Sequence, residues 1–228
     1  MSLVAHASVS IPGPGAERQK SQSQKKLAAF DANLSLEDRR RLKQWTLKDR
    51  DHLMPRQKNL YDERRKLKEE AVYWENVVAL KSDLLKMPGG GDSREAESIA
   101  QTAIRGFADL RKKYEMLRPP VLHNFLVNTG VKNEGLCWQW TRDMTRKLMG
   151  LHLKSYDLLW ATAREATVRE HNTVVVVSSG HPLEDGLFLD GWTHSGKPFW
   201  MRIPEDPKHP WKLGSYEGGD LVPEEPQK

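Results

Sequence analysis

The chain has a single cysteine, Cys137, and it is followed along the sequence by His171 and Asp190. A glycine stands two residues before Cys137 and an amphipathic pattern follows it, which predicts that the cysteine begins a helix. His171 precedes a run of four valines, and Asp190 ends a short apolar segment, so we expect each beside a strand. Cysteine, histidine and a carboxylate are the residue types of a thiol–imidazole–carboxylate site.

The predicted positions suit the chemistry of such a site. A thiol attacks as thiolate, and the partial positive charge of a helix N-terminus favours that form of Cys137. His171 would form an ion pair with the thiolate and later protonate the leaving group. Asp190 would fix the orientation of the imidazole from a neighbouring antiparallel strand. Four further residues are candidates for the cleft or the oxyanion hole: Asn128, Trp138, Asn172 and Trp192.

Each of the three residues also has a structural interpretation. A lone cysteine is most often a small core residue, a lone histidine is more often structural, and Asp190 before a glycine could open a turn. Their joint order and strand context favour a thiol site. The chain has no HExxH spacing, phosphate-binding loop or dinucleotide fingerprint, so we expect no catalytic metal and no cofactor.

Composition limits the other function classes. The 228 residues are 38% hydrophobic and 29% charged, enough for one domain or one domain with an extension. One cysteine excludes an internal disulfide and a multi-cysteine zinc site. Residues 1–90 carry six more basic than acidic residues. Aromatic residues do not interleave with the basic ones, so a solvated helical surface is favoured over a nucleic-acid interface.

The N-terminal region is expected to be helical after a disordered start. Residues 1–33 lack periodicity and predict disorder. Ser35 and Asp38 resemble a capping box that opens a helix toward Leu53. Apolar residues then recur at helical spacing from Leu60 to Leu85. Gly89–Gly91 follow as the clearest linker.

The remaining residues predict a mixed domain. We expect helices over 92–117, over 137–149 and, as a short element, over 156–166, with residues 121–136 as a loop. Strands are expected over 173–177 and 186–190, with a third over 197–203 and a loop-like tail from Pro204. The predicted organisation is therefore a disordered segment (1–33), a helical extension with its linker (34–91) and an α+β domain (92–228).

Three segments carry a resemblance to a known superfamily: Gly135-Leu136-Cys137-Trp138, Arg169-Glu170-His171-Asn172 and Asp190-Gly191-Trp192. They resemble papain-like and transglutaminase-like thiol enzymes, and most of all uncharacterised bacterial transglutaminase-like proteins of the cysteine-peptidase type. The resemblance covers residues 92–212. It implies a helix carrying the cysteine, packed on an antiparallel sheet, and acyl transfer through a thioester.

The resemblance leaves the acyl acceptor open, since water would make the enzyme a peptidase or amidase and an amine would make it a transglutaminase. It implies a peptide or protein amide as substrate. Papain-type enzymes have a glutamine shortly before the cysteine for the oxyanion hole, which is absent here. Asn128 or the backbone N–H groups at Cys137 would replace it.

Two other functions remain open from the sequence. The same fold could be a non-catalytic protein-binding domain, with residues 35–86 contacting a partner or self-associating, or the chain could be a structural helical adaptor. No apolar run predicts a transmembrane helix, and Met1–Gly15 is not an intact signal peptide. A cytoplasmic location and export after loss of a leader are both compatible with this sequence.

Overall fold

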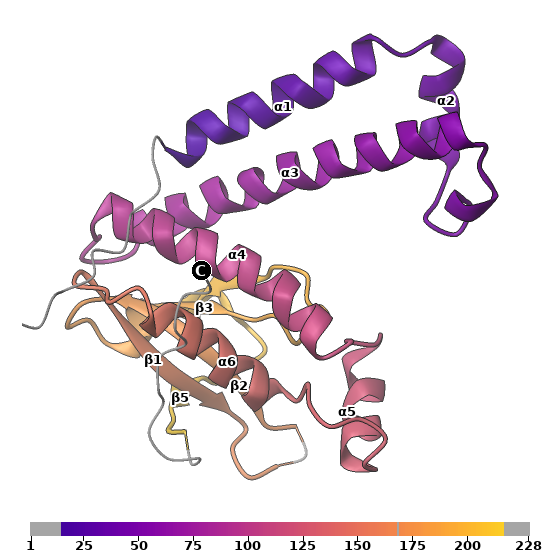
Figure 1. The fold of residues 1–228 in the computed structure, drawn as a ribbon. Coiled ribbons are helices and arrows are strands. Elements are labelled where there is room, and N and C mark those ends of the chain that lie inside the picture. The colour runs from indigo at the N-terminus through magenta and orange to yellow at the C-terminus, as the bar shows by residue number, and fades with distance from the viewer. Residues whose placement is uncertain (1–14, 168, 217–228) are drawn as a thin grey trace, which may run out of the picture. The chain divides into compact units, whose positions relative to one another are not determined.

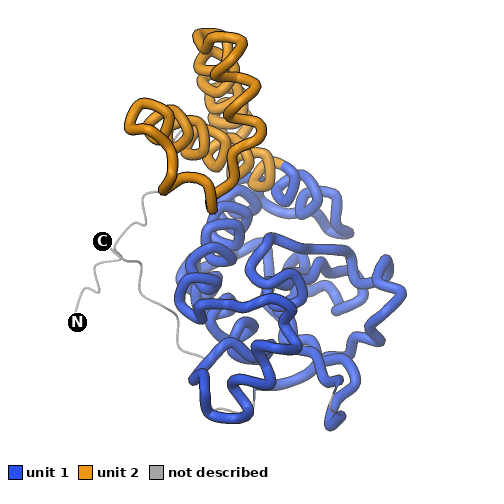
Figure 2. Tube along the Cα trace, turned by 90° about the vertical axis from the view of Figure 1, so that its right-hand side faces the viewer, with its two compact units in different colours: residues 1–12, 79–228 blue, residues 13–78 orange. Residues whose placement is uncertain are grey.

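The computed structural model describes residues 15–167 and 169–216. Its elements comprise six α-helices and a five-stranded antiparallel sheet, so the chain has an α+β fold (Figure 1). By their contacts they divide into two compact units, and the boundary lies inside α3, between residues 78 and 79 (Figure 2). Of the helices in the described residues, none has the length and apolar character needed to cross a bilayer.

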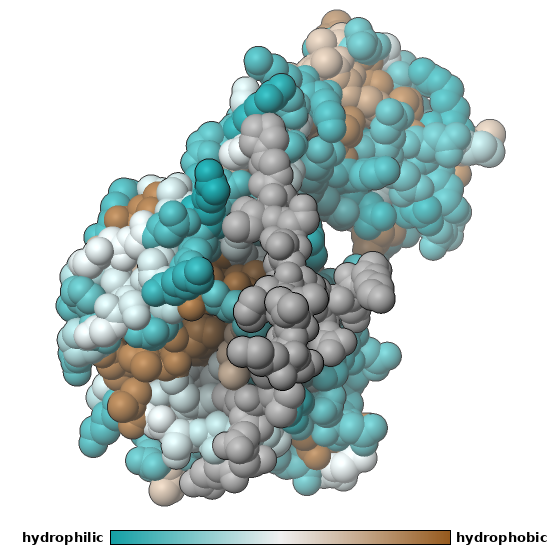
Figure 3. Space-filling model, turned by 60° about the vertical axis from the view of Figure 1, so that its left-hand side comes forward, coloured by the Kyte–Doolittle hydropathy of each residue, from teal (hydrophilic) through white to brown (hydrophobic). Residues whose placement is uncertain are grey.

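The first unit is a helical arm made of α1 (Ala16–Ala32), α2 (Leu36–Gln44) and α3 (Pro55–Leu85) up to residue 78. Ion pairs join its helices. Arg64 binds Asp31 through two nitrogens, at 2.7 and 3.0 Å, and Lys26 binds Glu70 at 3.0 Å. Such pairs suit an arm in which few apolar side chains are buried and whose surface is largely hydrophilic in Figure 3.

Two expectations for this region are corrected. Residues 1–33 were predicted to be disordered, but α1 occupies Ala16–Ala32, where Ala, Gln, Lys and Arg are strong helix formers; residues 1–14 lie outside the described residues. The helix from Ser35 ends at Gln44 and does not reach Leu53. Asp49 instead accepts hydrogen bonds from the backbone N–H and hydroxyl of Thr46, which stabilises a loop there.

The second unit holds α4 (Ser93–Lys113), α5 (Pro120–Asn128), α6 (Cys137–Met149) and the sheet. The strands are β1 (Tyr156–Ala163), β2 (His171–Ser178), β3 (Leu187–Leu189), β4 (Trp200–Arg202) and β5 (Lys212–Leu213), in the order β4-β3-β2-β1-β5. Helix α6 packs against β2, and α4 packs against α6.

The strands at the centre of the sheet fix where the chemistry-bearing residues lie. All eight residues of β2 are buried, as a β-branched central strand requires. Its pairing with β1 runs from Tyr156 opposite Ser178 to Ala163 opposite His171. On its other side Val174 lies opposite Leu189. The expectation that the strands of His171 and Asp190 are antiparallel neighbours is therefore confirmed.

Two further expectations are wrong. Residues 156–166 were predicted to form a short helix, but Tyr156–Ala163 form β1, because pairing with β2 and β5 outweighs the local pattern. Residues 121–136 were predicted to be a loop, but α5 begins at Pro120. Proline at a first helical position is favourable, so the Pro119-Pro120 pair starts a helix, whereas the preceding helix, expected over 92–117, ends at Lys113.

Candidate active site

Cys137 is the first residue of α6, as the sequence predicted. Gln139 caps this helix end from within, since its side-chain oxygen accepts hydrogen bonds from the backbone N–H groups of Gly135 (2.7 Å) and Leu136 (2.9 Å). Among the described residues, the N–H groups of Cys137 and Trp138 have no hydrogen-bond partner. They are free donors at a helix N-terminus beside the sulfur, which is the arrangement that an oxyanion hole needs.

The loop before Cys137 is held by a buried histidine. His123 Nδ1 accepts a hydrogen bond from the Leu117 N–H (3.2 Å), so Nε2 donates to the Glu134 carbonyl (2.9 Å). Gly135 lies against this ring at φ 121°, and a Cβ there would be 2.1 Å from His123 Nε2. A glycine is therefore required two residues before the cysteine.

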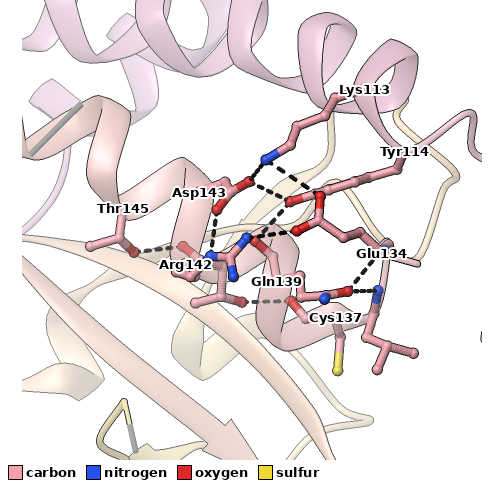
Figure 4. A network of polar contacts seen from close by, with 11 residues as sticks. Lys113, Tyr114, Glu134, Cys137, Gln139, Arg142, Asp143 and Thr145 are labelled. Atoms are coloured by element: carbon pink, nitrogen blue, oxygen red, sulfur yellow. Dashed lines mark hydrogen bonds and ion pairs between the residues drawn. The ribbon is translucent and has the colours of Figure 1, made fainter. Parts of the chain in front are cut away.

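A network of charged groups fixes the same loop to α4 and α6 (Figure 4). Asp143 accepts hydrogen bonds from Lys113 (2.5 Å), Tyr114 (2.7 Å) and Arg142 (2.6 Å), and Arg142 also reaches Glu134 at 3.4 Å. Burial raises the pKa of Asp143, but these three donors outweigh it and lower the pKa to about 2. The carboxylate stays ionised and ties the nucleophile loop to two helices.

His171 is buried, and its Nε2 donates a hydrogen bond to Asp190 Oδ2 at 2.9 Å. Asp190 follows β3 and is itself oriented by the loop after it. Its Oδ1 accepts from the N–H groups of Trp192 (2.8 Å) and Thr193 (3.0 Å), and its Oδ2 accepts from the Thr193 hydroxyl. The carboxylate therefore holds the imidazole in one orientation, with Nδ1 left for another partner.

The partner beside that ring is Cys137. Its thiol donates to the carbonyl of Glu170, the residue before His171, at 3.8 Å. His171 Nδ1 has no hydrogen bond of regular geometry to a described residue. Burial lowers the pKa of His171, but the hydrogen bond to Asp190 and the adjacent Cys137 side chain outweigh it and raise the pKa to about 10. The arrangement favours an imidazolium, the form that pairs with a thiolate.

Aromatic side chains cover His171. Its ring centroid lies 5.2 Å from that of Trp192, 5.3 Å from His209 and 5.6 Å from Trp211. Asp206 tethers the last two, because it accepts hydrogen bonds from His209 Nδ1 (2.8 Å) and Trp211 Nε1 (2.9 Å). Water is thereby kept from much of the imidazole, and Cys137 itself is only 9% exposed.

The sequence did not indicate this cover. His209 stands in a segment expected to be a loop-like tail, and nothing in the chain marks which strand that tail meets. The acid–histidine–tryptophan spacing Asp206, His209, Trp211 is the one available signal. It becomes informative only when β5 pairs with β1 and brings the tail to the site.

Of the four cleft candidates, the structure places the two tryptophans next to His171 or Cys137 and gives the two asparagines other surroundings. Trp192 contacts His171, and Trp138 adjoins Cys137. Asn172 is committed to the sheet, since its side-chain oxygen accepts from Trp160 Nε1 (2.9 Å) and from the Thr162 hydroxyl (2.8 Å). Asn128 is exposed at the last turn of α5, and among the described residues it has no hydrogen bond to the Cys137 loop.

Comparisons with protein-family models, with curated proteins and with solved structures gave no match for this chain. The chemistry of the site therefore has to be argued from its own residues.

Proposed function

We propose that this chain is a thiol-dependent acyl-transfer enzyme with a papain-like or transglutaminase-like α+β domain. Cys137 is the nucleophile, His171 the general acid and base, and Asp190 the carboxylate that orients the imidazole. The observation that carries the proposal is the buried 2.9 Å contact from His171 Nε2 to Asp190, which leaves Nδ1 beside a thiol at a helix N-terminus.

The reaction follows from this geometry. The Cys137 thiolate attacks the carbonyl carbon of an amide, and the backbone N–H groups of Cys137 and Trp138 stabilise the oxyanion. The C–N bond breaks as His171 gives the proton on Nδ1 to the leaving amine, which leaves a thioester on Cys137. Water or a second amine then loses a proton to His171 and attacks the thioester, which releases the acyl group and restores the thiolate and the imidazolium.

The test uses the fact that the chain has one cysteine. Iodoacetamide should alkylate the native protein at pH 6 much faster than it alkylates a small free thiol, because the proposed mechanism uses a thiolate and a free thiol is protonated at that pH. Mass spectrometry of the intact chain measures the rate, and Cys137→Ser shows that the label is on this residue. A native rate equal to that of the free thiol rules the proposal out.

A second candidate function is protein binding through the helical arm. Several large apolar side chains of the arm are exposed, and they are Leu36, Leu47, Met54 and Val72. Where exposed apolar residues form a contiguous patch, they are typical of a contact surface. Light scattering over a range of concentrations tests self-association, and replacing Leu36, Leu47 and Met54 by serine should abolish any association that this surface causes.

A further inference from the structure

A pocket of about 440 Å³ is lined by sequence neighbours of Cys137 and His171, although neither of these two residues lines it. Trp138, which follows Cys137, lines it, and so do Glu170 and Asn172, which flank His171. The carbonyl of the lining residue Glu170 accepts from the thiol at 3.8 Å. Glu170 therefore connects the pocket to the candidate nucleophile.

Aromatic rings form a large part of the wall. The Tyr216 ring lies 5.3 Å from Trp160 and 6.4 Å from Trp138, measured between centroids. The indole of Trp138 already attracts one cation, since the Arg142 guanidinium lies 5.4 Å from its centroid. Indole and phenol rings present electron-rich faces that attract organic cations.

The charged groups of the lining have one sign. Glu165 and Glu170 both line the pocket, and no Lys, Arg or His does so among the described residues. Glu170 is held in place, because its carboxylate accepts from Asn172 Nδ2 (3.0 Å) and from the Ala166 N–H (2.9 Å). Since Asn172 also accepts from Trp160 Nε1, a carboxylate and an aromatic wall are linked through one amide.

We propose that this pocket binds a positively charged side chain of the substrate, a lysine or an arginine near the amide that Cys137 attacks. Carboxylates supply the charge, and the aromatic rings enclose the alkyl stem and the cationic head. The proposal rests on the proposed function and adds to it the class of substrate.

The test measures binding without chemistry. The full chain carrying Cys137→Ser is titrated by calorimetry with N-acetyl-lysine methylamide, with its arginine counterpart and with the norleucine counterpart, in which a hydrogen atom replaces the ammonium. We expect a cationic ligand to bind at least about tenfold more tightly than norleucine. Equal affinities for the cationic and norleucine ligands overturn the proposal. So does an equal affinity for free n-butylammonium, which would indicate a site for a small amine instead of a peptide side chain.

Matched variants locate the binding. Replacing Glu165 and Glu170 together by glutamine keeps the shape and removes both charges, so the preference for the cationic ligand should be lost. Glu184→Gln removes a charge from Leu183–Asp185, outside the pocket lining, and should leave the preference unchanged. A preference that survives the double substitution contradicts the proposal. Because binding is read without Cys137, an unreactive thiol would refute acyl transfer while leaving the cation pocket standing.

Discussion

Two of the histidine–aspartate pairs among the described residues have the same bond length in different surroundings. His171 Nε2 lies 2.9 Å from Asp190, and His181 Nδ1 lies 2.9 Å from Asp185. The first pair is 4% exposed on both side chains and the second 33% on both. Only the first has a thiol beside it. The length of the hydrogen bond therefore does not distinguish the two pairs. Burial and the neighbouring thiol do.

The largest expected effect concerns the imidazoles themselves. His171→Ala should slow alkylation of Cys137 by iodoacetamide at pH 6 by about 100-fold or more, because the thiolate loses its counter-ion. His181→Ala should leave the rate unchanged. Mass spectrometry of the intact chain measures both, and equal rates in the two variants would remove the distinction between the pairs.

The carboxylates should differ in what they contribute to stability. Asp190→Asn breaks a buried pair and weakens the contacts with Trp192 and Thr193, so it should lower the free energy of unfolding by about 3 kcal/mol. Asp185→Asn affects a partly exposed pair and should cost less than about 1 kcal/mol. Urea unfolding measures both values. Similar losses would show that burial is not what distinguishes the two sites.

The pH dependence of stability gives another test of the difference between the two pairs, through the pKa of His171. Its pKa in the folded chain is raised to about 10, above its ordinary value of 6.5. The protonated ring therefore contributes stability that is complete below pH 6.5 and is lost as the pH rises toward 10. In nuclear magnetic resonance spectra the His171 ring should still be protonated at pH 8, and Asp190→Asn should bring its titration down. A wild-type ring that is neutral at pH 7.5 would contradict the ion pair.

The elements that carry the pair could be predicted from sequence because their signals are strong and local. The valine run predicts β2, the apolar stripe predicts α4, and the glycine before Cys137 predicts the start of α6. Strand β1 could not be predicted, because its residues become a strand only by pairing with β2. The order of Cys137, His171 and Asp190 predicted a thiol site but could not give the distances between the three side chains.

The surroundings of His171 and Asp190 could not be predicted from the sequence, because they depend on contacts between segments that are distant in the chain. Asp143 meets Lys113 across 30 residues, and Trp211 reaches His171 across 40. No local pattern fixes such pairings, since each depends on the finished packing of α4, α6 and the sheet. The same limit applies to the pocket, whose walls come from α6, strands β1 and β2, the loop between these strands and the residues after β5.

The smallest expected effect is that of removing the helical arm. It tests whether the second unit alone is sufficient for the reactivity of Cys137. Leu80, Leu84 and Met87 are buried, and Asp83 accepts a hydrogen bond from Trp200 of β4 at 3.0 Å. A chain shortened to begin at Ala79 keeps all of these groups, so it should fold and alkylate at Cys137 within about twofold of the full chain, because additive effects are expected for distant groups. Circular dichroism and the iodoacetamide rate measure the folding and the reactivity of this chain.

A chain that begins at Gly91 lacks the three buried side chains and Asp83, and should unfold at a lower urea concentration. If the longer of the two shortened chains folds but its thiol is no more reactive than a free one, the helical arm supplies part of the site, and the contrast between the two histidine pairs cannot be explained by their immediate neighbours.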